Sequence, residues 1–346
     1  MAVGWPGRCP LFLAACGLLV GPPATMRGAG PVDVAKFLAA EAGFSESEVE
    51  RIHRGEVVAK NLAADDQTVA IAAAALLAVP PDFFLAQVKR IEEFKKSPEV
   101  QQIGRVGATP SADDFARLSI DADELEALRR CRPGDCELKL DSRGIELVKG
   151  VKTNAELMTG LREHLAAYAA AYLRDGNPAL ITYNDRNKPL SLREEFGRIL
   201  AASPAIARDW PDLHAGLAQF SGTLPEGLEG FVYWSKEKAA SRSSVALTHL
   251  VIRPPAEGVA AVATKQIYSS HYTTASLGLT VLVDQTGTSG PRTLVIYLNR
   301  TRVDVFGGLL GGVKRALVRP RARSGAERMM ATMRTRMEGQ FRAALQ

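Results

Sequence analysis

The hydrophobic pattern of this chain changes its period along the sequence. Short runs of β-branched and small apolar side chains predict strands at residues 55–62, 68–79 and 99–106. The same pattern returns after residue 230. There the predicted strands are 231–235, 245–253, 262–272, 275–284 and 293–300. We expect two further short strands, 136–140 and 145–148, around the polar turn 141–144.

Helical patterns occupy most of the remaining chain. A leader over 32–54 contains the capping box Ser45-x-x-Glu48, a helix opens at Asp82, and an acidic helix covers 121–130. The segment at about 153–220 carries three helical patterns and indicates a helical insertion. The chain ends on a helix from about residue 325, in which apolar residues recur at helical spacing: Met330, Met333, Met337, Phe341 and Leu345.

These elements predict an α+β fold. The chain has 346 residues, of which 46% are hydrophobic and 23% charged, so it can bury a sizeable core. No repeat is visible at a period of 20–50 residues, which excludes solenoids. We therefore expect a single domain over residues 31–346.

Residues 1–30 differ from the rest of the chain. Arg8 precedes a twelve-residue apolar run from Cys9 to Val20, and a breaker-rich stretch follows. Such a run is too short to span a bilayer and matches the core of a signal peptide, so we expect a signal peptide over 1–30 and a periplasmic or otherwise exported protein. Leu13-Ala14-Ala15-Cys16 resembles a lipobox, which leaves a lipoprotein anchored at Cys16 as one alternative and a disordered tail as another.

Outside this leader the chain has two cysteines, Cys131 and Cys136, which flank Pro133-Gly134. Proline and glycine favour a tight turn here, and such a turn brings the cysteines close enough for a disulfide. In an exported protein we expect a structural disulfide, whereas in a cytosolic one they would be free thiols. Zinc would need two more ligands, and the spacing differs from a Cys-x-x-Cys redox motif.

Positive charge is concentrated at the C-terminal end. The formal net charge is +5, and residues 313–346 alone carry nine basic against two acidic side chains. A basic stripe suits anionic lipid headgroups or nucleic acid. We expect no nucleic-acid partner, because export disfavours one and this segment offers only Phe341 to stack on bases. Arg319, Arg321 and Arg323 are the candidate membrane-surface residues, with a solvated helix face as the alternative.

Catalytic motifs give no assignment. The chain lacks a Gly-x-Ser-x-Gly elbow, and the glycine run 307–312 is separated from Lys314 by one residue too many for a phosphate-binding loop. Glu50-x-x-His53 resembles half of a di-iron helix but has no second copy. We expect no metal, no cofactor and no identifiable catalytic residue, and leave open whether the protein is an enzyme.

The order of elements resembles the START-like, or SRPBCC, helix-grip superfamily. Strands, a Pro-Pro-Asp-Phe-Phe-Leu helix at 80–85, a run of antiparallel strands and a long amphipathic C-terminal helix carry the resemblance, over about 55–150 and 225–346. It implies a curved antiparallel sheet gripping the last helix, with an apolar cavity between them that commonly holds lipids, sterols or polyketides. The helical leader and the insertion depart from this pattern.

Such a cavity suggests candidate ligand-binding residues. Met330, Met333 and Met337 would offer flexible, polarizable surface to an apolar ligand, with plain core packing as the alternative. Along the predicted strand 262–272, strict alternation places Tyr268 on one face and His271 on the other, and either face could supply a polar group at a cavity wall.

Three functions follow as expectations. The first is an exported carrier that binds a hydrophobic small molecule or lipid. The second is a START-like enzyme acting on an apolar substrate, with His271 together with Tyr268 or His249 in the cavity. The third is a structural envelope protein with a filled core and no ligand.

Overall fold

The computed structural model describes residues 32–239, 242–288, 290–306 and 311–346. The expected signal peptide, the lipobox residue Cys16 and most of the glycine run 307–312 lie outside the described residues. Within the described ranges, no helix combines the length and the apolar character needed to cross a membrane.

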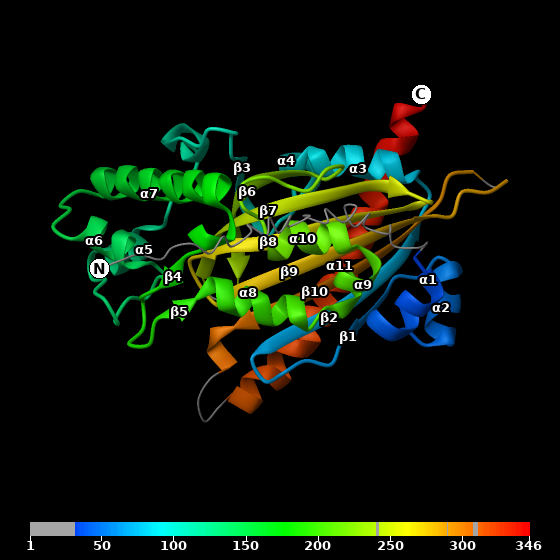
Figure 1. Ribbon diagram of the computed structural model, residues 1–346, viewed down its shortest axis with the longest axis horizontal. Helices are drawn as coiled ribbons and strands as arrows, with labels where there is room; N and C mark the ends of the chain where they lie inside the picture. Colours follow the sequence, from blue (N-terminus) through cyan, green and yellow to red (C-terminus); the bar gives the residue numbers. More distant parts are fainter. Residues whose placement is uncertain (1–31, 240–241, 289, 307–310) are drawn as a thin grey trace, which may run out of the picture.

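A large antiparallel sheet organises the molecule (Figure 1). Its eight strands follow the spatial order β1-β2-β10-β9-β8-β7-β6-β3, so β2 from the N-terminal part of the chain pairs with β10 from its C-terminal part. The strands are β1 Val58–Asn61, β2 Thr68–Leu77, β3 Val100–Arg105, β6 Glu229–Ala239, β7 Arg242–Ala256, β8 Val259–Ser269, β9 Thr273–Asp284 and β10 Thr293–Val303. A separate two-stranded sheet pairs β4 Thr182–Tyr183 with β5 Leu190–Ser191.

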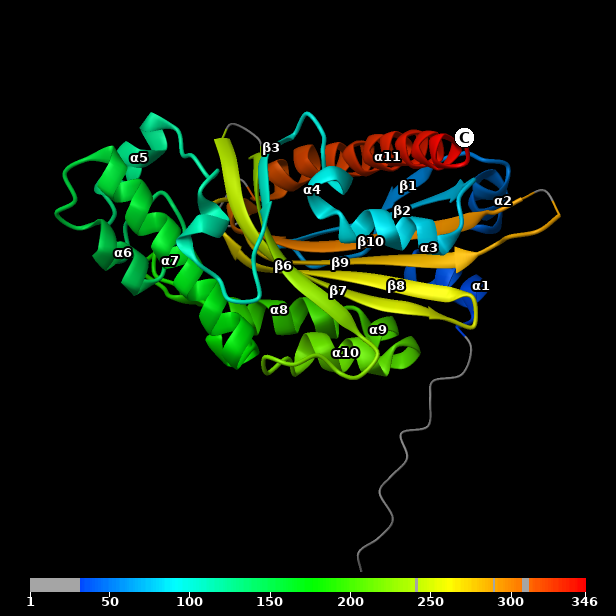
Figure 2. The ribbon, with the colours of Figure 1, turned by 90° about the horizontal axis from the view of Figure 1, so that it is seen from above.

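Helices cover both faces of the large sheet (Figure 2). On one face lie α3 Pro81–Lys89, α4 Ile91–Phe94 and the long α11 Gly311–Ala344. The insertion supplies the other face with α7 Asn154–Asp175, α8 Leu192–Ala201, α9 Pro204–Asp209 and α10 Pro211–Ala218. The remaining helices are α1 Val34–Lys36, a π-helical turn Phe37–Glu41, α2 Glu46–His53, α5 Ala122–Arg129, α6 Ser142–Val148 and the 3₁₀ turns Ala112–Phe115, Asn177–Ala179 and Asp304–Phe306.

The predicted fold class is confirmed. The chain is α+β, with a large antiparallel sheet, a long C-terminal helix, a helical leader and a helical insertion. Local sequence explains several helix starts, because the Ser45 and Glu48 side chains form the expected reciprocal capping box and Ser191 caps α8.

Two hydrophobic cores lie on opposite faces of the sheet. The first, under the insertion helices, includes the fully buried Trp210, Tyr172 and Trp234. The second, under α11 and α3, includes Phe84 and Met337. Nearly every side chain of β2 is buried because helices cover both faces of the sheet at this strand, which explains its continuous apolar sequence.

Two sequence-based expectations about local structure are wrong. Residues 136–140 form no strand and 145–148 belong to α6, because the Asp141 side chain accepts a hydrogen bond from the Gly144 backbone N–H and caps a helix. The last helix starts at Gly311 rather than near residue 325 and contains Pro320. A proline removes only one helical hydrogen bond, and packing against β1 and β2 maintains the helix through it.

The expected disulfide between Cys131 and Cys136 is confirmed, with Cα atoms 4.4 Å apart. Its hairpin docks on the loop before β5, where the Gly134 N–H donates to the Asn184 carbonyl at 2.8 Å and the Cys136 N–H to the Asp185 carbonyl at 3.1 Å. The disulfide therefore closes one short hairpin, and backbone hydrogen bonds attach that hairpin to the loop between β4 and β5.

Candidate functional site

A cavity of about 280 Å³ opens over strands β6 to β10, on the same face of the sheet as α11. This volume lies just below the range for small-molecule pockets, which begins at about 300 Å³. Its sixteen lining residues are Lys95, Tyr233, Ser235, Glu237, Ser244, Ala246, Thr248, Thr264, Gln266, Ser269, His271, Tyr272, Thr273, Ser276, Tyr297 and Asn299. Ala246 is the single member of this set without a polar side-chain atom, so polar groups are distributed around the cavity wall among the carbon atoms of the same side chains.

Strand alternation brings these side chains to one face. Every second residue of a strand points to the same side, which aligns Tyr233, Ser235 and Glu237 on β6 and places Tyr297 and Asn299 on β10. Further along the same strands the corresponding positions are apolar and enter the core under α11. One face of the sheet is thus divided into an apolar end and a polar end.

A β-bulge changes the alternation in β8. Opposite Leu247 and Thr248 of β7, the pairing shifts by one residue, so Ile267 and Tyr268 both enter the core under the insertion helices. Ser269 consequently returns to the cavity face beside Gln266. The sequence-based alternation over 262–272 is therefore wrong at this point, because the extra residue arises from pairing with β7.

Hydroxyl groups form a connected network at one end of the cavity. Ser269 Oγ lies 2.9 Å from Thr273 Oγ1 and 3.2 Å from Ser244 Oγ, and it donates to the His271 backbone carbonyl at 2.9 Å. Thr273 Oγ1 also lies 2.9 Å from Gln266 Oε1. Such a chain of hydroxyls can reverse its donor and acceptor roles, so it can adapt to a hydroxyl of a ligand.

Other polar groups in the cavity have spare hydrogen-bonding capacity. Among the residues that the structure describes, the hydroxyls of Thr248 and Thr264 and the side-chain NH₂ of Gln266 have no hydrogen-bond partner. Thr264 and Gln266 are half-buried and Thr248 is buried. These three groups lie on the central strands β7 and β8 and offer both donors and acceptors to a molecule in the cavity.

The two oppositely charged side chains in the lining neutralise each other. Lys95, which follows α4, places its Nζ 2.5 Å from Glu237 Oε1, and Ser235 Oγ donates to the same carboxylate oxygen at 2.7 Å. Burial alone would raise the pKa of Glu237, but the attraction of Lys95 outweighs this effect and the pKa is lowered. The pair therefore stays ionised and leaves no net charge at this wall.

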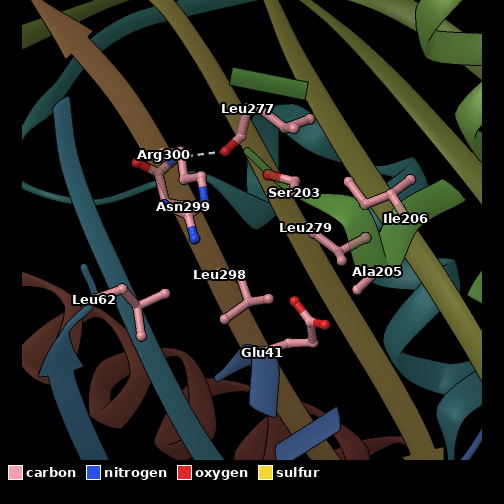
Figure 3. A pocket seen from close by; sticks show the side chains of 10 residues that line it. All are labelled: Glu41, Leu62, Ser203, Ala205, Ile206, Leu277, Leu279, Leu298, Asn299 and Arg300. Carbon is pink, nitrogen blue, oxygen red and sulfur yellow. Dashed lines mark hydrogen bonds between the residues drawn. The ribbon is translucent and has the colours of Figure 1, made fainter. Parts of the chain in front are cut away.

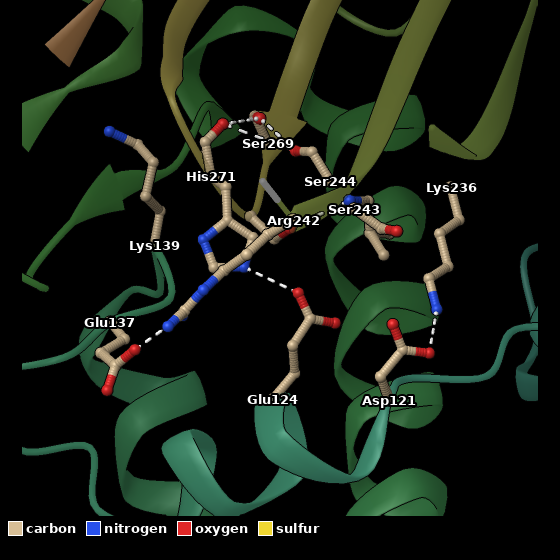
Figure 4. Close-up of polar contacts among 12 residues, drawn as sticks. Asp121, Glu124, Glu137, Lys139, Lys236, Arg242, Ser243, Ser244, Ser269 and His271 are labelled. Atoms are coloured by element: carbon tan, nitrogen blue, oxygen red, sulfur yellow. Dashed lines mark hydrogen bonds and ion pairs between the residues drawn. The ribbon is translucent and has the colours of Figure 1, made fainter. Parts of the chain in front are cut away.

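His271 stands at the rim of the cavity, in the turn between β8 and β9. Its Nε2 lies 3.1 Å from Glu124 Oε1, and both side chains are buried (Figure 4). The next residue, Tyr272, has a φ of 59°, a left-handed conformation that is uncommon for a bulky residue and that clusters at functional sites. The hydroxyls nearest to His271 bind its backbone carbonyl and not its ring, so the described contacts provide no activated nucleophile.

Two ion pairs reinforce the same end of the sheet. Lys236 Nζ lies 3.0 Å from Asp121 Oδ1, and Arg242 Nη1 lies 2.6 Å from Glu137 Oε2 (Figure 4). Together with the contact between His271 and Glu124, they attach residues 121–137 to the ends of β6, β7 and β8. The rim of the cavity is thereby held by a segment that is distant in the sequence.

The three methionines expected to bind ligand do not line this cavity. Met330 and Met337 are fully buried in the core under α11, and Met333 packs against that core. Tyr268 is buried on the opposite face of the sheet, where its hydroxyl donates to the Lys139 carbonyl at 3.1 Å. His271 is thus the one residue of the expected ligand-binding set that reaches the cavity.

His249, the other histidine considered for an enzyme, also lies on the opposite face. Its Nδ1 is 2.9 Å from the Tyr172 hydroxyl, and burial lowers its pKa to about 3. His271 therefore does not meet Tyr268 or His249 in one cavity. These two combinations, which the sequence suggested for an enzyme, are therefore not formed in the described structure.

The expected membrane-surface residues all belong to α11. Arg321 and Arg323 are exposed, whereas Arg319 is half-buried. Because residues four apart lie on neighbouring parts of a helix surface, Arg319 and Arg323 share one side and Arg321 points elsewhere. The three do not form one cluster.

Sequence reasoning missed most of the cavity. The usable signal was polar alternation in strands expected to face the last helix, such as Tyr233-x-Ser235-x-Glu237 and Thr264-x-Gln266. A polar residue at every second position on a face that should be apolar indicates either solvent or a polar site. Only the position of α11 distinguishes these two cases.

A second hollow is too small to act as a binding site. It has a volume of about 20 Å³ and lies among Glu41, Ala205, Leu279 and Arg300 (Figure 3), which leaves room for about one water. Among the described residues, no group of three or more His, Cys, Asp and Glu side chains is arranged to hold a metal ion. The polar cavity is therefore the candidate site.

Comparison with protein-family models, with curated proteins and with solved structures finds no match to this chain.

Proposed function

We propose that this protein binds a small, uncharged, hydroxyl-rich molecule in the cavity over β6 to β10. The observation that carries the proposal is the lining, in which fifteen of sixteen residues present a polar side-chain atom. Burying such groups against a lipid would leave donors and acceptors without partners, at about 1–3 kcal/mol each. A polyol or a sugar would pair with them.

The charge and shape of the cavity narrow the ligand class further. Lys95 and Glu237 satisfy each other, so a charged ligand would have to compete with an existing ion pair. Tyr233 and Tyr297 place aromatic rings in the cavity wall, and such rings can pack against the apolar C–H groups of a sugar. A volume of about 280 Å³ favours a single small ring over a long acyl chain.

The proposal retains the START-like resemblance and changes the chemistry of the ligand. A large sheet with a long C-terminal helix on the cavity face is compatible with a helix-grip fold. In this protein α11 covers the apolar end of that face and contributes no residue to the lining. We therefore propose a START-like scaffold whose ligand chamber is polar, in an exported protein.

Binding can be tested with named probes and a cavity-filling variant. Glucose and myo-inositol serve as neutral polyhydroxylated probes and palmitate as the apolar one, with calorimetric titration and thermal shift as readouts. Ala246→Phe fills the cavity floor, and Ala256→Phe adds the same ring at the exposed end of β7 as a matched control.

We expect a polyhydroxylated probe to raise the melting temperature of wild type and Ala256→Phe but not of Ala246→Phe. At a concentration of 100 times Kd, the expected stabilisation is about 2.7 kcal/mol. Binding of palmitate that Ala246→Phe abolishes would overturn the polar ligand class. Native mass spectrometry of protein from its own source provides a second check, since a co-purifying lipid would also overturn the polar ligand class.

A further inference from the structure

The first turns of α11 carry two exposed apolar side chains. Val313 is 60% exposed and Leu317 is 54% exposed. Further along the same helix, Ala326, Met330 and Met337 are buried against the sheet. In Figure 1 the start of α11, drawn in orange, extends beyond the lower edge of the sheet. An apolar pair therefore lies on a protruding part of the molecule.

Basic residues surround this pair. Between residues 313 and 326 the sequence has five basic side chains and no acidic one. Arg315 is held by Asp66, at 3.4 Å between Nη2 and Oδ1, which attaches this end of the helix to the loop before β2. Lys314, Arg319, Arg321 and Arg323 form no ion pair with any described residue.

Helix geometry determines which of these residues lie on the same side of α11. Val313 and Leu317 are four residues apart and lie on the same side of the helix. At about 100° per residue, Lys314 and Arg321 lie on one flank of this pair and Arg323 lies on the other, whereas Arg319 turns toward the side that faces the sheet. A narrow apolar strip with cations on both flanks is the arrangement of helices that lie in a membrane interface.

We propose that residues 312–323 of α11 dock on an anionic lipid surface. Val313 and Leu317 insert between headgroups, while the stems of Lys314, Arg321 and Arg323 extend along the apolar surface and carry their charges to the phosphates. Charge complementarity selects an anionic surface. The two exposed aliphatic side chains favour lipid over nucleic acid, whose phosphates would leave them in water.

The test uses the full chain and vesicles of two compositions. Co-sedimentation compares phosphatidylglycerol–phosphatidylcholine vesicles with phosphatidylcholine alone. Leu317→Ser removes apolar insertion and Arg321→Gln removes one flanking charge. Leu345→Ser and Arg342→Gln are matched controls, because they make the same changes at exposed positions at the other end of α11.

We expect binding to the anionic vesicles only. Leu317→Ser should weaken it about tenfold and Arg321→Gln about fivefold, while the two controls stay within about twofold of wild type. Melting curves of all four variants check that each is folded. No binding to anionic vesicles would overturn the proposal. Equal losses for variants and controls would also overturn it, since they would show that binding does not depend on residues 312–323. Loss with Arg321→Gln but not with Leu317→Ser would overturn it as well, because it would indicate electrostatic attraction to the vesicles without insertion.

Discussion

Lys265 provides the sharpest test of the electrostatics of this fold. It lies on β8 under the insertion helices and its side chain has no exposed surface. Its Nζ donates to Asn177 Oδ1, lies 3.4 Å from the Leu217 carbonyl and faces the rings of Phe196 and Tyr172 at 4.6 and 5.4 Å. No carboxylate in the described structure pairs with it. Burial lowers its pKa from 10.5 to about 7, and the charge of Arg193 adds to the effect.

The sign of the pH dependence follows from proton counting. Between pH 7 and pH 10.5 the unfolded chain holds a proton on Lys265 and the folded chain does not, so stability rises with pH over this interval. At 1.36 kcal/mol per pKa unit, a pKa of about 7 instead of 10.5 means that burying the charged Lys265 lowers the free energy of unfolding by at most about 5 kcal/mol. This cost is fully present at pH 7 and is gone above pH 10.5.

Replacing Lys265 by Met removes the cost while it keeps the length of the side chain. The replacement also removes the partner of Asn177 Oδ1, at about 1–3 kcal/mol, whereas the Leu217 carbonyl keeps a hydrogen bond from Asn177 Nδ2 at 2.9 Å. We expect Lys265→Met to be about 2–4 kcal/mol more stable than wild type at pH 7 and about 0–2 kcal/mol less stable near pH 10.

Urea unfolding at intervals from pH 7 to pH 10 measures this difference. The stability of Lys265→Met minus that of wild type should fall by about 1.4 kcal/mol per pH unit and change sign. Lys139→Met is the control, because Lys139 is similarly buried but its Nζ pairs with Asp304 at 2.8 Å, so that variant should be less stable at every pH. If the stability difference between Lys265→Met and wild type were the same at every pH, the reasoning would be refuted. Lys265 would then be charged in the folded protein, stabilised by the aromatic rings and carbonyls around it.

Three further substitutions test packing and covalent constraints by chemical unfolding. Replacing Cys131 and Cys136 by Ser should lower stability by about 2 kcal/mol, as expected for a short closed loop, and should abolish any effect of a reductant; unchanged stability would mean that hydrogen bonds alone hold the hairpin. Gly176→Ala should cost about 3 kcal/mol or more, because φ is 69° and the new Cβ would clash with the backbone oxygen of Phe220; a cost below about 1 kcal/mol would contradict this contact. Trp234→Phe removes the indole N–H that donates a hydrogen bond to the Asp114 carbonyl at 2.7 Å and should cost about 1–3 kcal/mol; unchanged stability would count against this hydrogen bond.

Much of the fold was predictable because its signals are local. The capping box at Ser45 and Glu48 fixed a helix start, and the Pro133-Gly134 turn correctly indicated the disulfide beside it. Asp141 shows the limit of such signals. An aspartate followed three residues later by glycine serves a turn or a helix cap equally well, and packing of α6 against α7 decides between them.

The candidate site was not predictable, because distant contacts determine it. The bulge that returns Ser269 to the cavity depends on pairing with β7, and Glu124, which meets His271, is 147 residues away. The Met stripe of α11 was visible in the sequence, but sequence alone does not say how far along the sheet α11 extends. That extent separates the apolar core from the polar cavity.

The strand order has a consequence for how the chain reaches this fold. β2 pairs with β10, so Leu77 faces Thr293 across more than two hundred residues of sequence. Until β10 has emerged from the ribosome or a translocation pore, β2 has β1 as its sole neighbour, and its apolar side chains face water on both sides. The sheet therefore closes late, after almost the whole chain is free, and the nascent protein needs protection from aggregation over that time.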